Sequence, residues 1–254
     1  MRFKEKIAVV TGAGSGIGEA TAYRLAKEGA TVVLVGRTIS KLEKVAANIN
    51  EEAVKPRAYC FVADVTNSAE VEQLGAYIEK EFGDLHVLIN CAGGSRKSPI
   101  LETTEKDWDD VQAVNLKSIF LVSKRLATIM INNEGGNERS IVNVASLSGY
   151  KAGSHIPHYS AAKAAVINFT RALAFELAPK GIRVNSVSPG FVSTDLTKEG
   201  LKNEKFVKSI ERHTALSRVG TSDEIANVIA FVASSEASYM TGSDLLVDGG
   251  WLIM

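Results

Sequence analysis

The stretch KIAVVTGAGSGIGEATAYRLAKEG (6–29) decides how this chain folds. An apolar, β-branched run at 6–11 leads into a glycine-rich loop at 11–18, and a helical pattern follows over about 16–28. Glycines in a strand-to-helix turn let backbone N–H groups approach a phosphate at the helix N-terminus. Because this loop belongs to the first strand–helix unit, it predicts nucleotide binding rather than an ordinary flexible turn.

The spacing of these glycines narrows the class of protein. The common dinucleotide fingerprint needs glycine at its first, third and sixth positions, and the sixth position counted from Gly12 is Ile17. Gly12, Gly16 and Gly18 instead form a Gly-x-x-x-Gly-x-Gly pattern. A Gly-Lys-Ser/Thr sequence does not follow, which argues against an NTPase.

Strand-like and helix-like patterns alternate along the rest of the chain. The apolar runs lie at 6–11, 30–36, 57–63, 86–90, 140–146, 182–188 and 244–249, and the helix-periodic stretches lie at about 16–28, 38–53, 67–82, 105–132, 157–179 and 222–234. Strands this apolar are buried on both faces, as in a parallel sheet. We predict one α/β domain over 1–254, a Rossmann-type doubly wound sheet of seven parallel strands flanked by helices.

One stretch interrupts the alternation. Residues 191–217 lie between the sixth strand and the last helix and are long and mixed in polarity. A segment of this kind is either a substrate lid or a surface excursion, and we expect an insertion that acts as a lid.

Composition excludes several classes of partner. The 254 residues are 45% hydrophobic, and 29 basic residues balance 29 acidic ones. This balance argues against a nucleic-acid or anionic-membrane surface, and no apolar run approaches the roughly 20 residues of a membrane span. The first residues do not resemble a secretory signal, and Cys60 and Cys91 form no metal or redox motif, so we expect a cytoplasmic protein.

Polar and small residues follow most of the predicted strands. In open α/β sheets, ligands bind outside the carboxyl ends of the strands, so these residues should meet at one edge. They are TGAGSGIG (11–18), Gly36-Arg37, Asp64-Val65, Asn90-Cys91-Ala92-Gly93, Ser146 and Pro189-Gly190.

The end of the second strand bears on the choice of cofactor. An acidic residue usually stands there to bind the ribose hydroxyls of NAD, but this chain has Gly36-Arg37-Thr38. Arg37 can pair with the 2′-phosphate of NADP or be a solvated loop residue. We expect NADP(H) to be favoured, with NAD(H) possible.

Tyr159 and Lys163 stand four residues apart in a predicted helix, so they share a face. Spacing alone is not decisive, because Tyr23 and Lys27 have the same spacing. Thirteen residues before Tyr159 stands Ser146, at the end of a strand, whereas Val10 stands thirteen residues before Tyr23, inside a strand. Only the first pair therefore has a serine partner at the expected cofactor edge.

With this set, the chain resembles the short-chain dehydrogenase/reductase family over its whole length. The matching features are TGAGSGIG, Asp64, Asn90-Cys91-Ala92-Gly93, Asn115 in AVNL, Ser146, Tyr159-Ser160-Ala161-Ala162-Lys163, Pro189-Gly190 with Thr194, and VDGG at 247–250. One departure is Cys91, where a second asparagine is common.

The resemblance implies an oxidoreductase that transfers a hydride between NADP(H) and a carbonyl or secondary alcohol, and a homotetramer. Its implied catalytic residues are Asn115, Ser146, Tyr159 and Lys163. Its implied cofactor contacts are Gly12, Ser15, Gly16, Ile17, Gly18, Arg37, Asp64, Val65, Asn90, Ala92, Gly93, Tyr159, Lys163, Pro189, Gly190, Val192 and Thr194. A non-catalytic NAD(P)-binding regulator on the same fold is the alternative, and the complete Asn–Ser–Tyr–Lys set favours the enzyme.

Electrostatics agree with an acid–base role for Tyr159. A free tyrosine titrates near ~10. A cation ~4 Å away at an effective dielectric near 20 is worth about 4 kcal/mol, or roughly three pKa units, and burial of the phenol opposes this shift. We therefore expect the pKa of Tyr159 to move towards neutrality.

Other candidate sites are weaker. His155 and His158 are three residues apart, but no third metal ligand is evident, so we expect no metal site. The chain also lacks the Gly-x-Ser-x-Gly pattern of a hydrolase.

The substrate is less well defined by the sequence. We expect pocket walls from 94–101, from around 147–158, from 191–217 and from Trp251, with an apolar lining that includes Phe191, Leu196, Leu201 and Phe206, and with charge from Arg96 and Lys97. The closest general resemblance is to 3-oxoacyl carrier-protein reductases, which dock the carrier on basic residues near the ends of the central helices. Phe175 and the loop NNEGGN (132–137) lack that charge, so a 3-oxoacyl thioester and another ketone both remain open.

Overall fold

The computed structural model describes residues 1–254 except 52, 54 and 133–138. The loop NNEGGN (132–137) therefore lies, apart from Asn132, outside the described residues, as does Glu52 near the expected end of the second helix.

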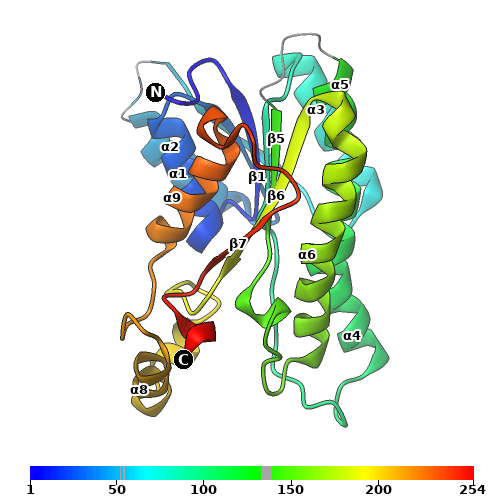
Figure 1. The fold of residues 1–254 in the computed structure, drawn as a ribbon. Coiled ribbons are helices and arrows are strands. Elements are labelled where there is room, and N and C mark those ends of the chain that lie inside the picture. Colours follow the sequence, from blue (N-terminus) through cyan, green and yellow to red (C-terminus); the bar gives the residue numbers. More distant parts are fainter. Residues whose placement is uncertain (52, 54, 133–138) are drawn as a thin grey trace.

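A seven-stranded parallel sheet forms the middle layer of the molecule, in the order β3-β2-β1-β4-β5-β6-β7 (Figure 1). The strands are β1 (Ile7–Thr11), β2 (Thr31–Gly36), β3 (Ala58–Val62), β4 (Val87–Asn90), β5 (Arg139–Val144), β6 (Ile182–Pro189) and β7 (Asp244–Val247). Each predicted strand is present, so the sequence-based expectation of a doubly wound parallel sheet is confirmed.

Helices cover both faces of the sheet. Figure 1 shows α1, α2 and α9 on one side and α3, α4, α5 and α6 on the other. The helices are α1 (Gly16–Lys27), α2 (Ile39–Glu51), α3 (Ser68–Phe82), α4 (Glu105–Gln112), α5 (Ser118–Asn132), α6 (Pro157–Leu177), α7 (Lys198–Leu201), α8 (Glu204–His213) and α9 (Ser222–Ala233). The molecule is thus a three-layer α/β/α domain.

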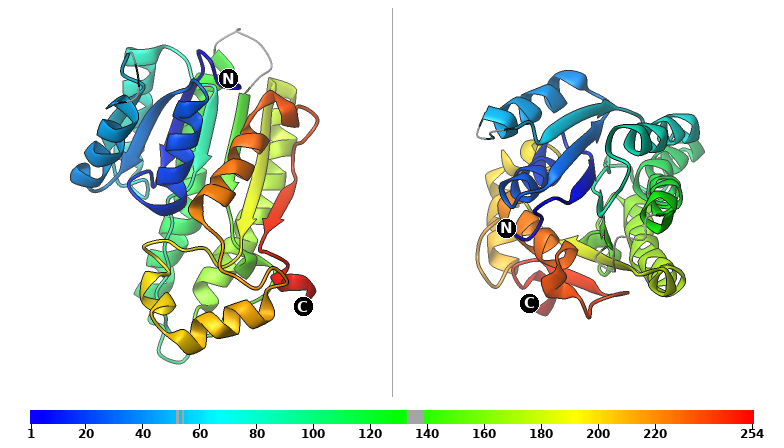
Figure 2. Two further views of the ribbon diagram at one scale, coloured as in Figure 1. Left: turned by 90° about the vertical axis from the view of Figure 1, so that its left-hand side faces the viewer. Right: turned by 90° about the horizontal axis from the view of Figure 1, so that it is seen from above.

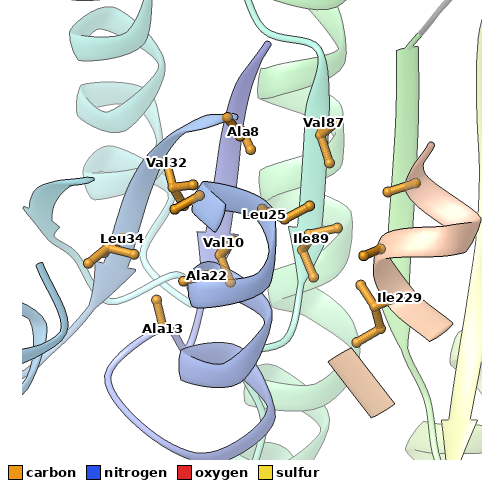
Figure 3. Close-up of a cluster of buried hydrophobic side chains, with 14 of the residues drawn as sticks. Ala8, Val10, Ala13, Ala22, Leu25, Val32, Leu34, Val87, Ile89 and Ile229 are labelled. Atoms are coloured by element: carbon orange, nitrogen blue, oxygen red, sulfur yellow. The ribbon is translucent and has the colours of Figure 1, made fainter. Parts of the chain in front are cut away.

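Successive strand residues point to opposite layers of helices. Val10 and Leu34 belong to the core beneath α1 and α9, whereas Val9 and Val33 belong to the core beneath α3 and α5. Figure 3 shows the first core, where Leu25 of α1 and Ile229 of α9 meet the strand side chains. All six of these side chains are inaccessible to solvent. Both faces of each strand are therefore apolar, which is the reason the strands read as continuous apolar runs.

β1 lies between β2 and β4, where the winding of the chain reverses direction. Val10 pairs with Leu34 on one side and with Ile89 on the other. All strands run the same way, so the residues that follow them gather at one edge, at the bottom of Figure 1. This edge carries the candidate site.

Two helical stretches differ from their expected form. The stretch expected at 105–132 is α4 and α5 joined by a π-turn, Ala113–Lys117. The stretch 191–217 contains α7 and α8, which the sequence did not predict as helices. Figure 2 (left) shows α8 beside the C-terminal residues, beyond the carboxyl edge of the sheet.

Among the described residues, no helix combines the length and the hydropathy needed to cross a bilayer.

Candidate active site

The glycine loop is shaped by three close approaches. Gly12 has a positive φ of 68°, and a Cβ there would lie 2.9 Å from Ala92 Cα. A Cβ on Gly18 would lie 2.3 Å from the carbonyl oxygen of Gly12, and Gly16 (φ 57°) faces the Thr194 side chain at 3.2 Å. Any side chain at Gly12 or Gly18 would push the loop away from the sheet or from α1. The predicted glycine pattern therefore has a structural cause at each position.

The N-terminus of α1 points out of this loop. Ser15 is the N-cap residue in an extended conformation, and its hydroxyl makes no capping hydrogen bond within the described part of the chain. The first N–H groups of a helix otherwise lack partners and favour an anion. The loop can therefore present N–H donors to a phosphate group, as the sequence predicted.

Thr11 connects the loop to the end of β4 and was missed by the sequence analysis. Its hydroxyl oxygen accepts hydrogen bonds from the backbone N–H groups of Cys91 (3.0 Å) and Ala92 (3.1 Å). The segment from Asn90 to Gly93 is thereby fixed beside the glycine loop. The sequence shows a hydroxyl residue at the end of the first strand, but its role becomes clear only from its contacts with Cys91 and Ala92.

Asn90 is the last residue of β4, and its side chain is buried and turned towards β5. Its Nδ2 group donates to Ser123 Oγ and to Asn143 Oδ1, both at 2.9 Å. Asn143 in turn donates to Thr170 Oγ1 at 2.9 Å. These groups form a buried polar chain across β4, β5 and two helices, and they leave the backbone of Asn90 as the part that can face a ligand.

At the neighbouring strand ends, Arg37 and Asp64 lie close together. Burial alone would raise the pKa of Asp64, but hydrogen bonds from Thr66 and the charge of Arg37 outweigh it and hold that pKa below its usual value. Arg37 is exposed and makes no hydrogen bond to any residue that the structure describes. Its guanidinium is therefore available to a ligand.

The remaining predicted cofactor contacts also lie along this edge. Ile17 packs on the core beneath α1, and Val65 and Val192 are buried. Gly190, next to Pro189, approaches the next strand end so closely that a Cβ would lie 2.6 Å from Asp248 Cα.

Ser146, Tyr159 and Lys163 meet at the end of β5. Tyr159 and Lys163 lie on one face of α6, with Lys163 Nζ 5.6 Å from the centre of the Tyr159 ring. The Ser146 hydroxyl lies near enough to the Tyr159 phenol to act on its pKa, which it lowers against the effect of burial. Lys163 is buried, and its Nζ donates to the carbonyl oxygen of Val144 at 2.7 Å. The structure thus brings together the three groups that the sequence predicted.

The direction of the Tyr159 pKa differs from our expectation. Burial raises this pKa, and the Ser146 hydroxyl only partly opposes the increase. Lys163 does not lower it, because burial also lowers the pKa of Lys163 itself, to about 8. Desolvation of the buried phenol therefore outweighs the lysine charge at this site.

Asn115 lies within the π-turn and is fully buried. Its Nδ2 group donates to the carbonyl oxygens of Gly94 (2.7 Å) and Val111 (2.9 Å). A Cβ on Gly93 would lie 2.9 Å from Asn115 Oδ1 and 3.6 Å from Lys163 Nζ, so the Gly93 backbone faces both side chains. π-Turns of this kind often mark functional sites.

Aromatic side chains gather beyond the catalytic groups. Phe191 lies 4.7 Å from Trp251 and 5.7 Å from Phe206 of α8, measured between ring centres, and His213 lies 5.6 Å from Trp251. Lys151 Nζ lies 5.9 Å from the centre of the Trp251 ring. This aromatic cluster, Phe191, Phe206, His213 and Trp251, joins the end of β6, α8 and the C-terminal residues.

The two histidines differ in their surroundings, and Arg96 is paired within the chain. His158 is buried, His155 is exposed, and the described residues contain no cluster of three metal-ligating side chains. Arg96 pairs with Asp107 (2.6 Å) and Asp110 (3.1 Å), so its charge is balanced within the chain.

Comparison with known proteins agrees with this geometry. The family model described as "Enoyl-(Acyl carrier protein) reductase" matches residues 12–252. The chain is 39% identical to the 3-oxoacyl-[acyl-carrier-protein] reductase of Thermotoga maritima over the full length of both proteins. It is 38% identical to the meso-2,3-butanediol dehydrogenase of Serratia marcescens, with 98% of this chain and 96% of that protein covered. A solved short-chain dehydrogenase/reductase from Brucella melitensis, 35% identical, superposes with a TM-score of 0.91 over 98% of each chain.

The chain belongs to the short-chain dehydrogenase/reductase family. It is therefore an NAD(P)-dependent oxidoreductase that acts on carbonyl and alcohol groups. This outcome favours the enzyme over the regulator that the sequence left as an alternative.

Burial of Lys163 in this short-chain dehydrogenase/reductase has a consequence for stability. Its folded-state pKa of about 8 lies below the ~10.4 of an unfolded lysine, so the fold disfavours the charged form. This destabilisation of the fold is fully present below about pH 8. It disappears as the pH rises towards ~10.4, where the lysine is neutral in both the folded and the unfolded state.

Lys163→Met is therefore expected to raise the Tm of the cofactor-free protein at pH 7 while it abolishes turnover. The change removes a buried charge, and each kcal/mol is worth roughly 2–4 °C in a chain of this size. Differential scanning fluorimetry between pH 7 and 10 measures the effect, which should shrink as the pH rises. Lys27→Met, at an exposed lysine of matching spacing, is the control. A Lys163→Met protein that melts below the wild type at pH 7 would contradict the account.

Proposed function

We propose that this enzyme reduces a ketone to a secondary alcohol, or catalyses the reverse reaction, with NADP(H) as the favoured cofactor. The observation that carries the proposal is the contact between Ser146 and Tyr159, with Lys163 beneath the tyrosine ring, at the carboxyl edge of the sheet. In this proposal Ser146, Tyr159, Lys163 and Asn115 are the catalytic set.

The residues at this edge fit a nicotinamide dinucleotide. The backbone at Gly12 and Gly18 is packed too closely for a Cβ, at Gly12 because of Ala92. The N-terminus of α1 lies at the same loop. When bound, the cofactor supplies or accepts the hydride. The protein holds the substrate and manages the proton.

Each catalytic side chain has a separate part in the proposal. Ser146 holds the substrate oxygen, and Tyr159 gives its proton to that oxygen during reduction or removes it during oxidation. A raised pKa keeps Tyr159 protonated near neutral pH, which suits a proton donor. Lys163 binds the nicotinamide ribose in this scheme, and Asn115 anchors the water that connects Lys163 with solvent.

Two basic residues support the preference for NADP(H). Arg37 is exposed, makes no hydrogen bond or salt bridge within the described chain, and follows Gly36, which carries no charge to repel a phosphate. Lys41 is a second cation that the sequence analysis did not include: its side chain lies against Gly14 of the glycine loop, where a Cβ would be 3.0 Å from Lys41 Cβ. Its Nζ pairs with Asp195 at 3.2 Å, in an exposed contact that a phosphate can replace.

The substrate is proposed to be an apolar ketone without a strong negative charge. The aromatic cluster supplies an apolar wall, and Arg96 is neutralised by two aspartates. Among the similar proteins, one is named for a carrier-bound 3-oxoacyl substrate and another for a small diol. At the end of α6, Phe175 is 86% exposed where a carrier would need a cation. The account therefore favours a free ketone over a carrier-bound thioester.

The two substrate classes can be separated by one comparison. NADPH oxidation is followed with a 3-oxoacyl carrier-protein thioester, its short thioester analogue and a small diketone as substrates. We expect kcat/KM for the carrier-bound thioester to be no higher than for the short analogue. A carrier-bound substrate that is preferred at least about tenfold would show that the carrier is docked.

Residues 191–217 are proposed to act as a lid. Thr194 touches Gly16 of the glycine loop, and Phe206 of α8 touches Phe191. Ile210 is the buried residue of α8, so this helix is held by few apolar contacts. Amide hydrogen exchange in 191–217 should slow when NADPH and substrate bind, and equal exchange with and without ligands would argue for a fixed surface excursion.

A homotetramer in the cytoplasm completes the proposal. Among the apolar residues of α5, α6 and the turn between α4 and α5, Ile119, Val122 and Val166 are buried in the core of the single chain, which removes them as interface candidates. Phe120 is 43% exposed, and the edge strand β7 exposes Leu246 by 37%, so an apolar surface remains. Light scattering at micromolar concentration should give four chains, and a monomer would refute the assembly. The two free cysteines suit a reducing compartment.

A further inference from the structure

His158 stands next to Tyr159 and has an unsatisfied imidazole. Its side chain is fully buried, and neither Nδ1 nor Nε2 has a hydrogen-bond partner among the residues that the structure describes. A neutral imidazole offers one donor and one acceptor. A buried polar group without a partner is strongly unfavourable, so this side chain calls for a partner outside the protein chain.

A second unsatisfied group lies in a neighbouring segment. Ser95 Oγ is buried and also has no hydrogen-bond partner within the described residues. The preceding residue, Gly94, is held at both backbone groups by the side chain of Asn115. The carbonyl oxygen of His158 accepts a hydrogen bond from Gln112 Nε2 at 2.8 Å. Since Gln112 and Asn115 are one helical turn apart, the residue before Ser95 and the backbone of His158 are bound by neighbouring positions of the same helix.

A further contact joins the two segments. The N–H of Ser98 donates to the carbonyl oxygen of His155 at 2.7 Å, so the strip 95–98 runs beside the residues that lead into α6. Both unsatisfied groups therefore belong to one layer between this strip, α4 and the start of α6.

The Asp107 carboxylate of α4 does not hydrogen-bond the His158 ring. The pKa of Asp107 is held below its usual value chiefly by the Thr104 hydroxyl, and more weakly by the nearby Arg96 and His158 side chains. Asp107 therefore lies within electrostatic reach of the imidazole. Its oxygens, however, bond the Thr104 hydroxyl at 2.7 Å and Arg96 at 2.6 Å. The imidazole remains unpaired beside an occupied carboxylate.

We propose that His158 and Ser95 bind a buried water molecule that bridges them and fixes the start of α6. Water suits this site because an imidazole and a hydroxyl can each donate as well as accept, and because the His158 ring is fully buried. The bridge holds the residue before Tyr159 against the π-turn that carries Asn115. His158 and Ser95 are thus positioning residues, and their effect on turnover rests on the proposed role of Tyr159.

A double-mutant cycle tests the bridge without relying on activity. Ser95→Ala, His158→Leu and the double variant are compared by Tm. Each single change should lower Tm by about 2–4 °C, as expected for the loss of about one hydrogen bond in a chain of this size. The double variant should melt no lower than the less stable single variant, because the two groups share one water. Shifts that add in the double variant would overturn the proposal.

Controls keep this result interpretable. Ser154→Ala, at an exposed serine of the same region, should leave Tm unchanged and add nothing to His158→Leu. If His158→Leu does not fold, His158→Gln replaces it in the cycle, and the same non-additivity is required. As a second readout, kcat of the single variants should fall while their Kd for NADPH is unchanged.

A crystal structure at high resolution gives the direct observation. It should show an ordered water within hydrogen-bond distance of His158 and Ser95 in the wild type, and none in the double variant. A dry space between the two side chains would overturn the proposal even if the enzyme proves fully active.

Discussion

Tyr159→Phe is expected to lower kcat by about 10²–10⁴-fold, the range for loss of a positioned general acid, while NADPH binding persists. The substitution removes one hydroxyl and keeps the ring above Lys163. The Ser146 hydroxyl would lose its partner, but the glycine loop and α1 would be unchanged. Steady-state turnover together with a fluorescence titration of NADPH separates the two effects.

The chain contains its own control for this substitution. Tyr23 has the same spacing from Lys27, but its hydroxyl accepts a hydrogen bond from Asn48 Nδ2 at 2.8 Å, and its ring packs on the core beneath α1. Tyr23→Phe should leave kcat within about twofold, since this hydrogen bond is exposed. If Tyr159→Phe retained a turnover close to that of Tyr23→Phe, Tyr159 would not be the proton donor.

Gly36→Asp combined with Arg37→Ala is expected to invert the cofactor preference. A hydrogen bond to a charged group contributes roughly 1.5–3 kcal/mol, which corresponds to about a ten- to hundredfold preference for NADPH in the wild type. The variant removes the cation and adds a carboxylate that repels the 2′-phosphate and accepts hydrogen bonds from the ribose of NAD. The ratio of kcat/KM for NADPH and NADH measures the change.

The structure indicates that this double variant will fold. A Cβ on Gly36 would lie 3.3 Å from Leu42 Cδ2, which is the end of a flexible side chain. Lys44 is an exposed lysine on α2, the helix that carries Leu42. Lys44→Ala also removes one positive charge and should leave the ratio of kcat/KM for NADPH and NADH unchanged. A wild-type enzyme that prefers NADH would identify Arg37 as a solvated loop residue.

The sheet could be predicted because its residues repeat one simple pattern. Val9, Val10, Val33 and Leu34 are buried on alternate faces, so each strand appears in the sequence as an uninterrupted apolar run. The glycine loop was predictable for a similar reason, since Gly12 and Gly18 are required by contacts within one strand–helix unit. Patterns that depend on neighbours in the sequence are visible without a structure.

Features that depend on distant contacts were not predictable in this way. The π-turn divides the stretch 105–132 where the Asn115 side chain bonds Gly94, 21 residues away. Asn90 looks like a ligand-facing residue at a strand end, but its side chain pairs with Asn143 on the next strand. Lys41 reaches the glycine loop only through the packing of α2.

At the candidate active site, the chemical groups could be predicted from the sequence, but their electrostatics could not. Spacing placed Tyr159 and Lys163 on one face of α6, and Ser146 completes the set. The direction of the Tyr159 pKa required knowledge of burial, which raises it, and of the Lys163 contact with the Val144 carbonyl. The identity of the chemical groups was therefore predictable, whereas their protonation was not.

The measurement that tests the central claim most directly is the oxidation of NADPH by the wild-type enzyme in the presence of a panel of ketones, followed by absorbance. The account predicts ketone-dependent loss of NADPH, with at least one apolar ketone turned over and with NADP⁺-dependent oxidation of the matching secondary alcohol. A protein that binds NADPH tightly but turns over no ketone or alcohol would contradict the claim that Ser146, Tyr159 and Lys163 form a catalytic site.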